Sequence, residues 1–171
     1  TEAYYQTERG SHSSLGFTEK RKAMFMEPGT IYMYYARGGD SLNFSARGDG
    51  NGVLIKSGLA FMGQHSSEIS LSGMQQLNPI NGRMRSPERL CSGQTLLCRS
   101  LGLKVPDWNQ GSLKRNKLVL EDVGYCPDRL VQCKRLGIPE GRDEHLPYRF
   151  VDYEYTRSAT SNPKAGEHTG I

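Results

Sequence analysis

The chain has 171 residues and a mass of 19.1 kDa, which suits one domain and leaves little room for a second. Lysine and arginine outnumber aspartate and glutamate by 22 to 18, so the net charge of +4 permits a polyanionic partner without requiring one. No apolar run approaches the roughly 18–20 residues of a membrane span, and no signal peptide opens the chain. These features exclude a membrane protein.

The first half of the chain predicts short strands joined by glycine turns. Residues 1–5 predict the end of a strand, and a polar loop follows as far as Lys22. Residues 30–36 are rich in β-branched and aromatic side chains, so they predict a strand. Residues 42–45 and 53–56 predict two more, because glycine-rich breaks precede both. This part of the chain therefore predicts an antiparallel sheet.

The middle of the chain predicts helices. Apolar residues recur at helical spacing from Leu71 and stop before Pro79. Ser86 followed by Pro87 is typical of a helix start, and a leucine-rich helix is expected from about Gln94.

The last third of the chain is less regular. Residues 118–120 predict a strand, 127–136 a short helix and 147–156 a last strand, and residues 159–171 are expected to be a flexible polar tail. Strands, then helices, then a strand indicate an α+β domain with a curved, mainly antiparallel sheet and surrounding helices, not a doubly wound parallel sheet.

The four cysteines lie in two pairs, each with a spacing of seven, and neither pair matches a zinc site: Cys91, Cys98, Cys126 and Cys133. We therefore expect reduced thiols and no metal.

An ordered series of short blocks runs through the chain. It opens with Thr1-Glu2-Ala3-Tyr4 and continues through residues 11–13, 24–34, 42–45, 48–50, 53–56, 90–93, 97–98 and 147–150. In this order the blocks strongly resemble the alkyladenine (3-methyladenine) DNA glycosylase family. The resemblance covers most of the chain, with a glycosylase domain expected over residues 1–158.

The resemblance implies a monofunctional hydrolase that initiates base excision repair. Such an enzyme cleaves the N-glycosidic bond of alkylated or deaminated purines, of 3-methyladenine, 7-methylguanine or hypoxanthine type, in duplex DNA. The nucleotide must be flipped out of the stack, because the bond is unreachable inside the duplex. Water is the nucleophile, so no cofactor is expected, and an intracellular, DNA-associated monomer is implied.

Individual positions match the family's site residues. Glu2 matches the glutamate that activates water, and Lys56 falls where the family commonly has an arginine that helps to hold that water. The residues expected to bind and select the base are Tyr4, His12, Met24, Tyr34 and Asn43. Aromatic faces suit a charged, alkylated purine, and the asparagine is expected to reject the guanine amine.

The DNA contacts depart from the family pattern. Many relatives insert a tyrosine into the duplex where this chain has Arg37, so either Arg37 or Tyr35 is expected to act as the wedge. A basic group expected after Gly93 is missing. Phosphate contacts are therefore assigned to Thr18, Lys20, Arg21 and Lys22.

The sequence is also compatible with two other interpretations. The family's domain has strands before the first block, and they are absent from this sequence. A module that binds damaged DNA without cleaving it is therefore one alternative, and a structural or RNA-associated domain with a basic face is another. Each residue also has an ordinary explanation, such as surface solvation for Glu2 and strand packing for the tyrosines.

Overall fold

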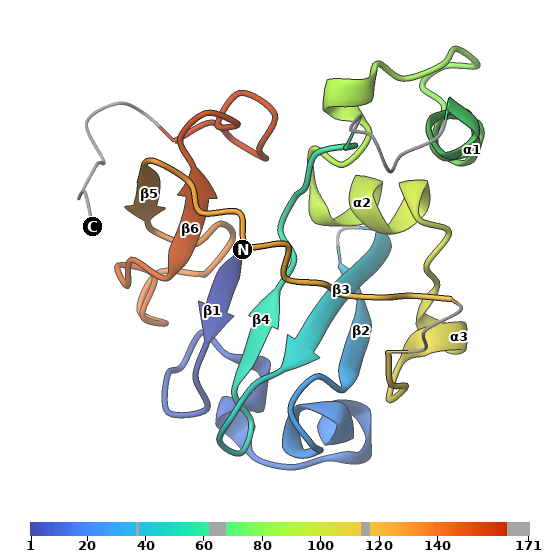
Figure 1. Cartoon of the computed structure of the whole chain (residues 1–171). Coiled ribbons are helices and arrows are strands. Elements are labelled where there is room, and N and C mark those ends of the chain that lie inside the picture. The colour runs from blue at the N-terminus through green and yellow to red at the C-terminus, as the bar shows by residue number, and fades with distance from the viewer. Residues whose placement is uncertain (37, 62–67, 114–116, 164–171) are drawn as a thin grey trace.

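A computed structural model describes residues 1–36, 38–61, 68–113 and 117–163. Within these residues six strands form one sheet, in the order β2-β3-β4-β1-β6-β5, and all neighbouring strands are antiparallel (Figure 1). The strands are β1 (Glu2–Tyr4), β2 (Ile31–Ala36), β3 (Gly39–Ser45), β4 (Gly52–Leu54), β5 (Leu130–Cys133) and β6 (Arg149–Asp152). The predicted single α+β domain is confirmed.

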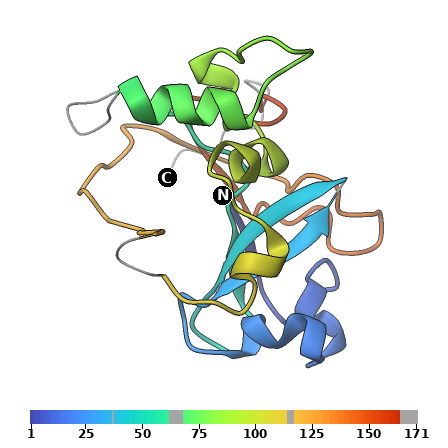
Figure 2. The ribbon, with the colours of Figure 1, turned by 90° about the vertical axis from the view of Figure 1, so that its right-hand side faces the viewer.

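Short helices surround this sheet. The α-helices are α1 (Glu68–Leu77), α2 (Gln94–Ser100) and α3 (Val105–Trp108), and the 3-10 helices are η1 (His12–Leu15), η2 (Glu19–Phe25) and η3 (Pro87–Arg89). In Figures 1 and 2, α1 and α2 lie beyond one end of the central strands, and η1 and η2 beyond the other. None of the described helices is long and apolar enough to cross a membrane.

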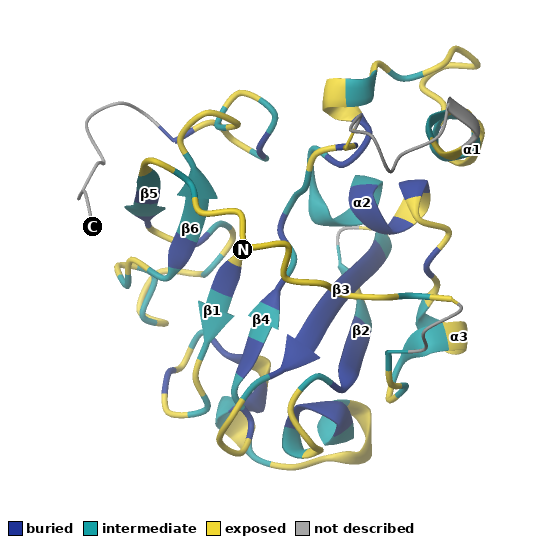
Figure 3. Ribbon diagram, viewed as in Figure 1, coloured by how far each residue is buried: buried dark blue, intermediate teal, exposed yellow. Residues whose placement is uncertain are grey.

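The main core lies on one face of β2 and β3. Side chains alternate between the two faces of a strand, so Ile31 and Met33 point into the core together with Leu42 and Phe44 of β3. Residues of α2 and of the segments around it complete this core, and Figure 3 shows buried residues concentrated in β2, β3 and α2. The intervening residues of β2 and β3 therefore belong to the opposite face.

On that opposite face, the strand register aligns residues of four neighbouring strands in a row. Tyr32 lies opposite Asn43, Asn43 opposite Leu54, and Leu54 opposite Glu2. Directly opposed residues have their Cβ atoms about 4.5–5.5 Å apart, so four strands bring four distant positions together. Tyr34 and Tyr4 lie two residues along from the ends of this row, on the same face.

Two predicted elements at the C-terminal side are wrong. Residues 127–136 do not form a helix: they contain β5, in which Val131 and Cys133 are buried and alternate with less buried neighbours. Residues 118–120 do not form a strand; Val119 and Leu120 are exposed. A short apolar run fits both periodicities, and pairing with β6 decides in favour of a strand over residues 130–133.

Smaller differences concern boundaries. The strand after the β2 hairpin begins at Gly39 rather than at residue 42, and the predicted polar loop contains η1 and the first part of η2. Ser86 precedes only one 3-10 turn, and its side chain makes no capping bond. All four cysteines are free. The flexibility expected for residues 159–171 stays a prediction, and residues 164–171 lie outside the described part of the chain.

Candidate active site

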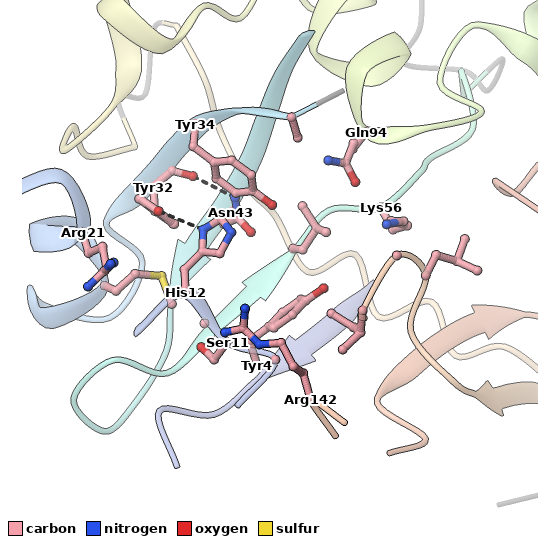
Figure 4. Close-up of a pocket in the computed structure, with 18 of the residues that line it drawn as sticks. Tyr4, Ser11, His12, Arg21, Tyr32, Tyr34, Asn43, Lys56, Gln94 and Arg142 are labelled. Atoms are coloured by element: carbon pink, nitrogen blue, oxygen red, sulfur yellow. Dashed lines mark hydrogen bonds between the residues drawn. The ribbon is translucent and has the colours of Figure 1, made fainter. Parts of the chain in front are cut away.

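A cavity of about 600 Å³ opens on the polar face of the sheet (Figure 4). This volume lies in the usual range for small-molecule and cofactor sites. Its lining comes from four strands, from η1 and η2, from the start of α2 and from the loop after β5. Among the lining residues are eight of the predicted site residues, namely Tyr4, His12, Arg21, Met24, Tyr34, Tyr35, Asn43 and Lys56.

Glu2 lies beneath the floor of this cavity and is fully buried. Its Oε1 accepts the backbone N–H of Leu136 at 3.0 Å, and its Oε2 accepts the Tyr4 hydroxyl at 2.8 Å. The Lys56 ammonium lies 3.4 Å from Oε2 and compensates the buried carboxylate charge. A carboxylate has about four acceptor positions, so these three contacts do not use its full hydrogen-bonding capacity.

A second buried ion pair supports the floor from behind. The Arg135 guanidinium forms a bidentate pair with Glu8, and its Nη1 also donates to the Ala3 carbonyl at 2.9 Å. The same guanidinium lies 4.5 Å from the centre of the Tyr4 ring. Arg135 precedes Leu136, so this pair fixes both the aromatic ring of the floor and the backbone N–H that binds Glu2.

The pKa of the Tyr4 hydroxyl, in the floor of the cavity, is raised by its surroundings. The loss of water around Tyr4 raises the pKa of its hydroxyl, and the adjacent Glu2 carboxylate raises it further. The hydroxyl therefore remains a hydrogen-bond donor to Glu2 at physiological pH.

Three aromatic rings form one wall. The His12 ring lies 4.4 Å from the Tyr34 ring, and the Tyr32 and Tyr34 rings are 5.5 Å apart. Burial raises the pKa of Tyr32 to about 12, so its hydroxyl can donate to His12 Nδ1 at 3.1 Å (Figure 4). Loss of water around the imidazole lowers the pKa of His12, and the charges of Arg21 and Arg142 lower it further. A neutral imidazole in this wall does not repel a cationic base.

Asn43 and Met24 also line the cavity. The Asn43 amide donates from Nδ2 to the Tyr32 carbonyl at 3.1 Å, which fixes its orientation. Met24 packs against Gly52, where an added Cβ would come within 2.7 Å of the methionine methyl group. Glycine at this position therefore lets η2 approach the sheet.

Only some of the residues predicted to contact DNA line the cavity. Arg21 and the exposed Tyr35 line the cavity, whereas Thr18, Lys20 and Lys22 lie outside it. Thr18 and Lys20 are exposed, and Lys22 lies 3.9 Å from Glu19. The second wedge candidate, Arg37, lies outside the described residues.

Sequence reasoning missed the contribution of the loop after β5. Leu136, Gly137, Ile138, Pro139 and Arg142 line the cavity. These residues were hidden because the preceding segment was interpreted as a helix, and nothing local connects them with residues 2–12. Gln94, which donates to Ser41 at 3.0 Å, was noted as a helix start and as part of the segment after Gly93 that lacks the expected basic group, but not as a residue of the cavity.

The comparisons with known proteins place this chain in a family. The chain matches the methylpurine-DNA glycosylase (MPG) family over residues 1–156. The chain therefore belongs to the methylpurine-DNA glycosylase family, and it is a monofunctional DNA glycosylase, a hydrolase of base excision repair.

Individual relatives agree with this assignment. A protein of Pseudomonas syringae pv. syringae, assigned as a 3-methyladenine DNA glycosylase, is 62% identical over 164 residues, which are 95% of this chain and 74% of the relative. A Pseudomonas aeruginosa protein with the same assignment is 58% identical over 95% of this chain and 69% of its own length. A protein of Methanocella arvoryzae with the same assignment is 31% identical over 157 residues, which are 89% of this chain and 73% of the relative. The family resemblance predicted from the sequence is confirmed.

Proposed function

We propose that this enzyme releases alkylated or deaminated purines, of 3-methyladenine, 7-methylguanine and hypoxanthine type, after they are flipped out of duplex DNA. The observation that carries this proposal is the buried Glu2 carboxylate, held between Leu136, Tyr4 and Lys56 under a cavity with aromatic walls. A carboxylate so held serves as a general base for a water molecule at the floor.

The proposed reaction is a hydrolysis at C1′ of the flipped deoxyribose. Glu2 accepts a proton from water, the water oxygen bonds to C1′, and the bond from C1′ to the purine nitrogen breaks with its electron pair leaving on the base. A cationic alkylated purine becomes neutral when it leaves. A deaminated purine leaves with a negative charge, which the proton on Glu2 balances. The negative charge of Glu2 also favours the oxocarbenium-like transition state.

The cavity walls suit the recognition of a flipped purine. The rings of Tyr4, His12 and Tyr34 offer aromatic faces, which attract a positively charged base. We assign to Asn43 the exclusion of the guanine amine, since its amide is fixed by the Tyr32 carbonyl. Met24 limits the depth of the cavity.

The surface around the cavity suits duplex DNA. Arg21, Lys20 and Lys22 follow one another on η2, and Thr18 precedes this helix. We assign phosphate contacts to these residues, and the wedge to Tyr35, which is exposed at the cavity, or to Arg37. The enzyme is proposed to act as a monomer within the cell, and its binding weakens as salt rises.

The test is base release from duplexes that carry one alkylated purine or one hypoxanthine. The parent enzyme is compared with Glu2→Gln, which keeps the shape but removes the base, and with Glu121→Gln, an exposed residue far along the chain. We expect release by the parent and by Glu121→Gln, and a loss of about 10²–10⁴-fold in Glu2→Gln. Release by a folded Glu2→Gln at the parent's rate would contradict the role of Glu2. Binding of damaged DNA without release by any variant would favour the non-cleaving module.

A further inference from the structure

Two arginines approach the mouth of the cavity from opposite sides of His12 (Figure 4). We propose that Arg142, on the loop after β5, forms with Arg21 a clamp for the phosphodiester backbone of the flipped nucleotide. This inference rests on the proposed function, and it assigns to Arg142 a role that the sequence did not indicate.

Arg142 is held in place by the opposite loop. Its Nε and Nη2 both donate to the Arg9 carbonyl, at 3.0 and 2.7 Å. The adjacent Asp143 carboxylate accepts the Arg9 backbone N–H at 2.7 Å, so this acid faces the backbone. At Gly10 an added Cβ would lie 2.9 Å from the Arg142 carbonyl oxygen, which shows how closely the two loops pack. The guanidinium is therefore positioned before any ligand arrives.

Arg21, on the other side, is held by one hydrogen bond to a backbone carbonyl. Its Nη1 donates to the Gly16 carbonyl at 3.1 Å. Within the described part of the chain, neither Arg21 nor Arg142 lies within 4.0 Å of a carboxylate oxygen. Both charges nevertheless act on His12, whose pKa they lower, which is consistent with their flanking position. Two anchored guanidinium groups without acidic partners remain available for an anion.

The chemistry of the substrate identifies that anion. An alkylated purine is cationic, so a guanidinium does not attract it, and the aromatic walls serve the base instead. The phosphates on either side of the extruded sugar are the anions that reach the cavity mouth when a nucleotide is flipped. A planar guanidinium suits phosphate oxygens, because it can donate two parallel hydrogen bonds. The clamp therefore favours the extruded backbone over regular duplex.

The experiment separates backbone binding from base recognition and from catalysis. It measures the dissociation constants of the parent, Arg142→Ala, Arg142→Lys, Arg21→Ala and the double alanine variant for a duplex with a tetrahydrofuran abasic-site analogue and for plain duplex, over a range of salt. Arg129→Ala is the matched control: it removes one exposed charge, from a side chain that stacks 4.3 Å from the Tyr153 ring and does not line the cavity. Thermal unfolding checks that each variant folds.

We expect Arg142→Ala to weaken binding of the abasic duplex by about tenfold. The slope of log K against log salt should fall by about 0.9 for each arginine removed. Plain duplex should be affected less, Arg142→Lys should recover part of the loss, and Arg129→Ala should resemble the parent.

Two failures are distinguishable. If the parent prefers the abasic duplex but Arg142→Ala keeps the parent's affinity and salt slope, the clamp is wrong while the proposed function stands. If the parent does not distinguish the abasic duplex from plain duplex and releases no base, the proposed function fails and the clamp fails with it.

Discussion

The two faces of the central strands are made from alternating residues of the same segments, yet they are stabilised in different ways. On one face Ile31 and Met33 pack against the helices and bury apolar surface. On the other face Tyr32 and Asn43 are linked by hydrogen bonds, and Glu2 is buried with its charge compensated by Lys56. A substitution on the first face leaves a cavity, whereas one on the second leaves an unpaired polar or charged group.

The largest effect on stability is expected at the ion pair behind the floor. Arg135→Gln leaves the Glu8 carboxylate buried without its cation, and breaking such a pair costs about 3–5 kcal/mol. Urea unfolding measures the change. The double variant Glu8→Gln/Arg135→Gln should recover part of the loss because no buried charge remains. A double variant that unfolds as easily as Arg135→Gln would contradict this account.

On the apolar face, Met33→Ala should cost about 2–5 kcal/mol of unfolding free energy, because it removes a fully buried side chain from the core. Tyr35→Ala, two positions further along β2, truncates a side chain that is 66% exposed and should change stability by no more than about 0.5 kcal/mol. Chemical denaturation of the two variants side by side provides the measurement. Equal losses would show that the two positions are not separated as the structure places them.

On the polar face, Asn43→Ala should cost only about 0.5–1.5 kcal/mol, the usual contribution of one hydrogen bond. Its main consequence should be on selectivity: release of purines with the guanine amine should rise relative to those without it. Competitive base release from mixed duplexes tests this. An unchanged ratio would remove Asn43 from base selection.

The smallest effect concerns pH. The pKa of His12 is lower in the folded chain than its ordinary value of 6.5, so the unfolded chain binds the proton more readily. The stability that this provides is present above pH 6.5 and is lost as the pH falls through the folded pKa. Unfolding curves at pH 5 and pH 7.5 should therefore differ less for His12→Asn than for the parent. The same difference in both proteins would contradict the prediction.

The sequence predicted the polar face better than it predicted what supports it. The strand at residues 30–36 was evident because β-branched and aromatic side chains are concentrated there, and the ordered blocks contain positions that the structure brings together in the lining of one cavity. The burial of Glu2 could not be predicted in this way, since a glutamate at a strand end is usually solvated.

The supporting contacts were invisible because they join distant segments. Arg135 and Glu8 are 127 residues apart, and no local pattern connects them. The interpretation of residues 127–136 as a helix also hid the turn that brings Leu136 onto Glu2 and Arg142 onto the cavity mouth. The alternation of Val131 and Cys133 was the one local signal for β5, and it is short.

The position of β1 in the sheet has a consequence for biosynthesis. β1 lies between β4 and β6, so the backbone beside Glu2 is completed by residues near position 149. Contacts of such long sequence separation form slowly, because a long loop must close first. A nascent chain that has emerged only as far as residue 56 contains Glu2, Tyr4 and Lys56 but lacks Arg135 and Leu136. The side chains around Glu2 are thus made early, while the contacts that enclose them wait for β5, the loop after it and β6, so a chain that ends before these segments has no assembled cavity floor.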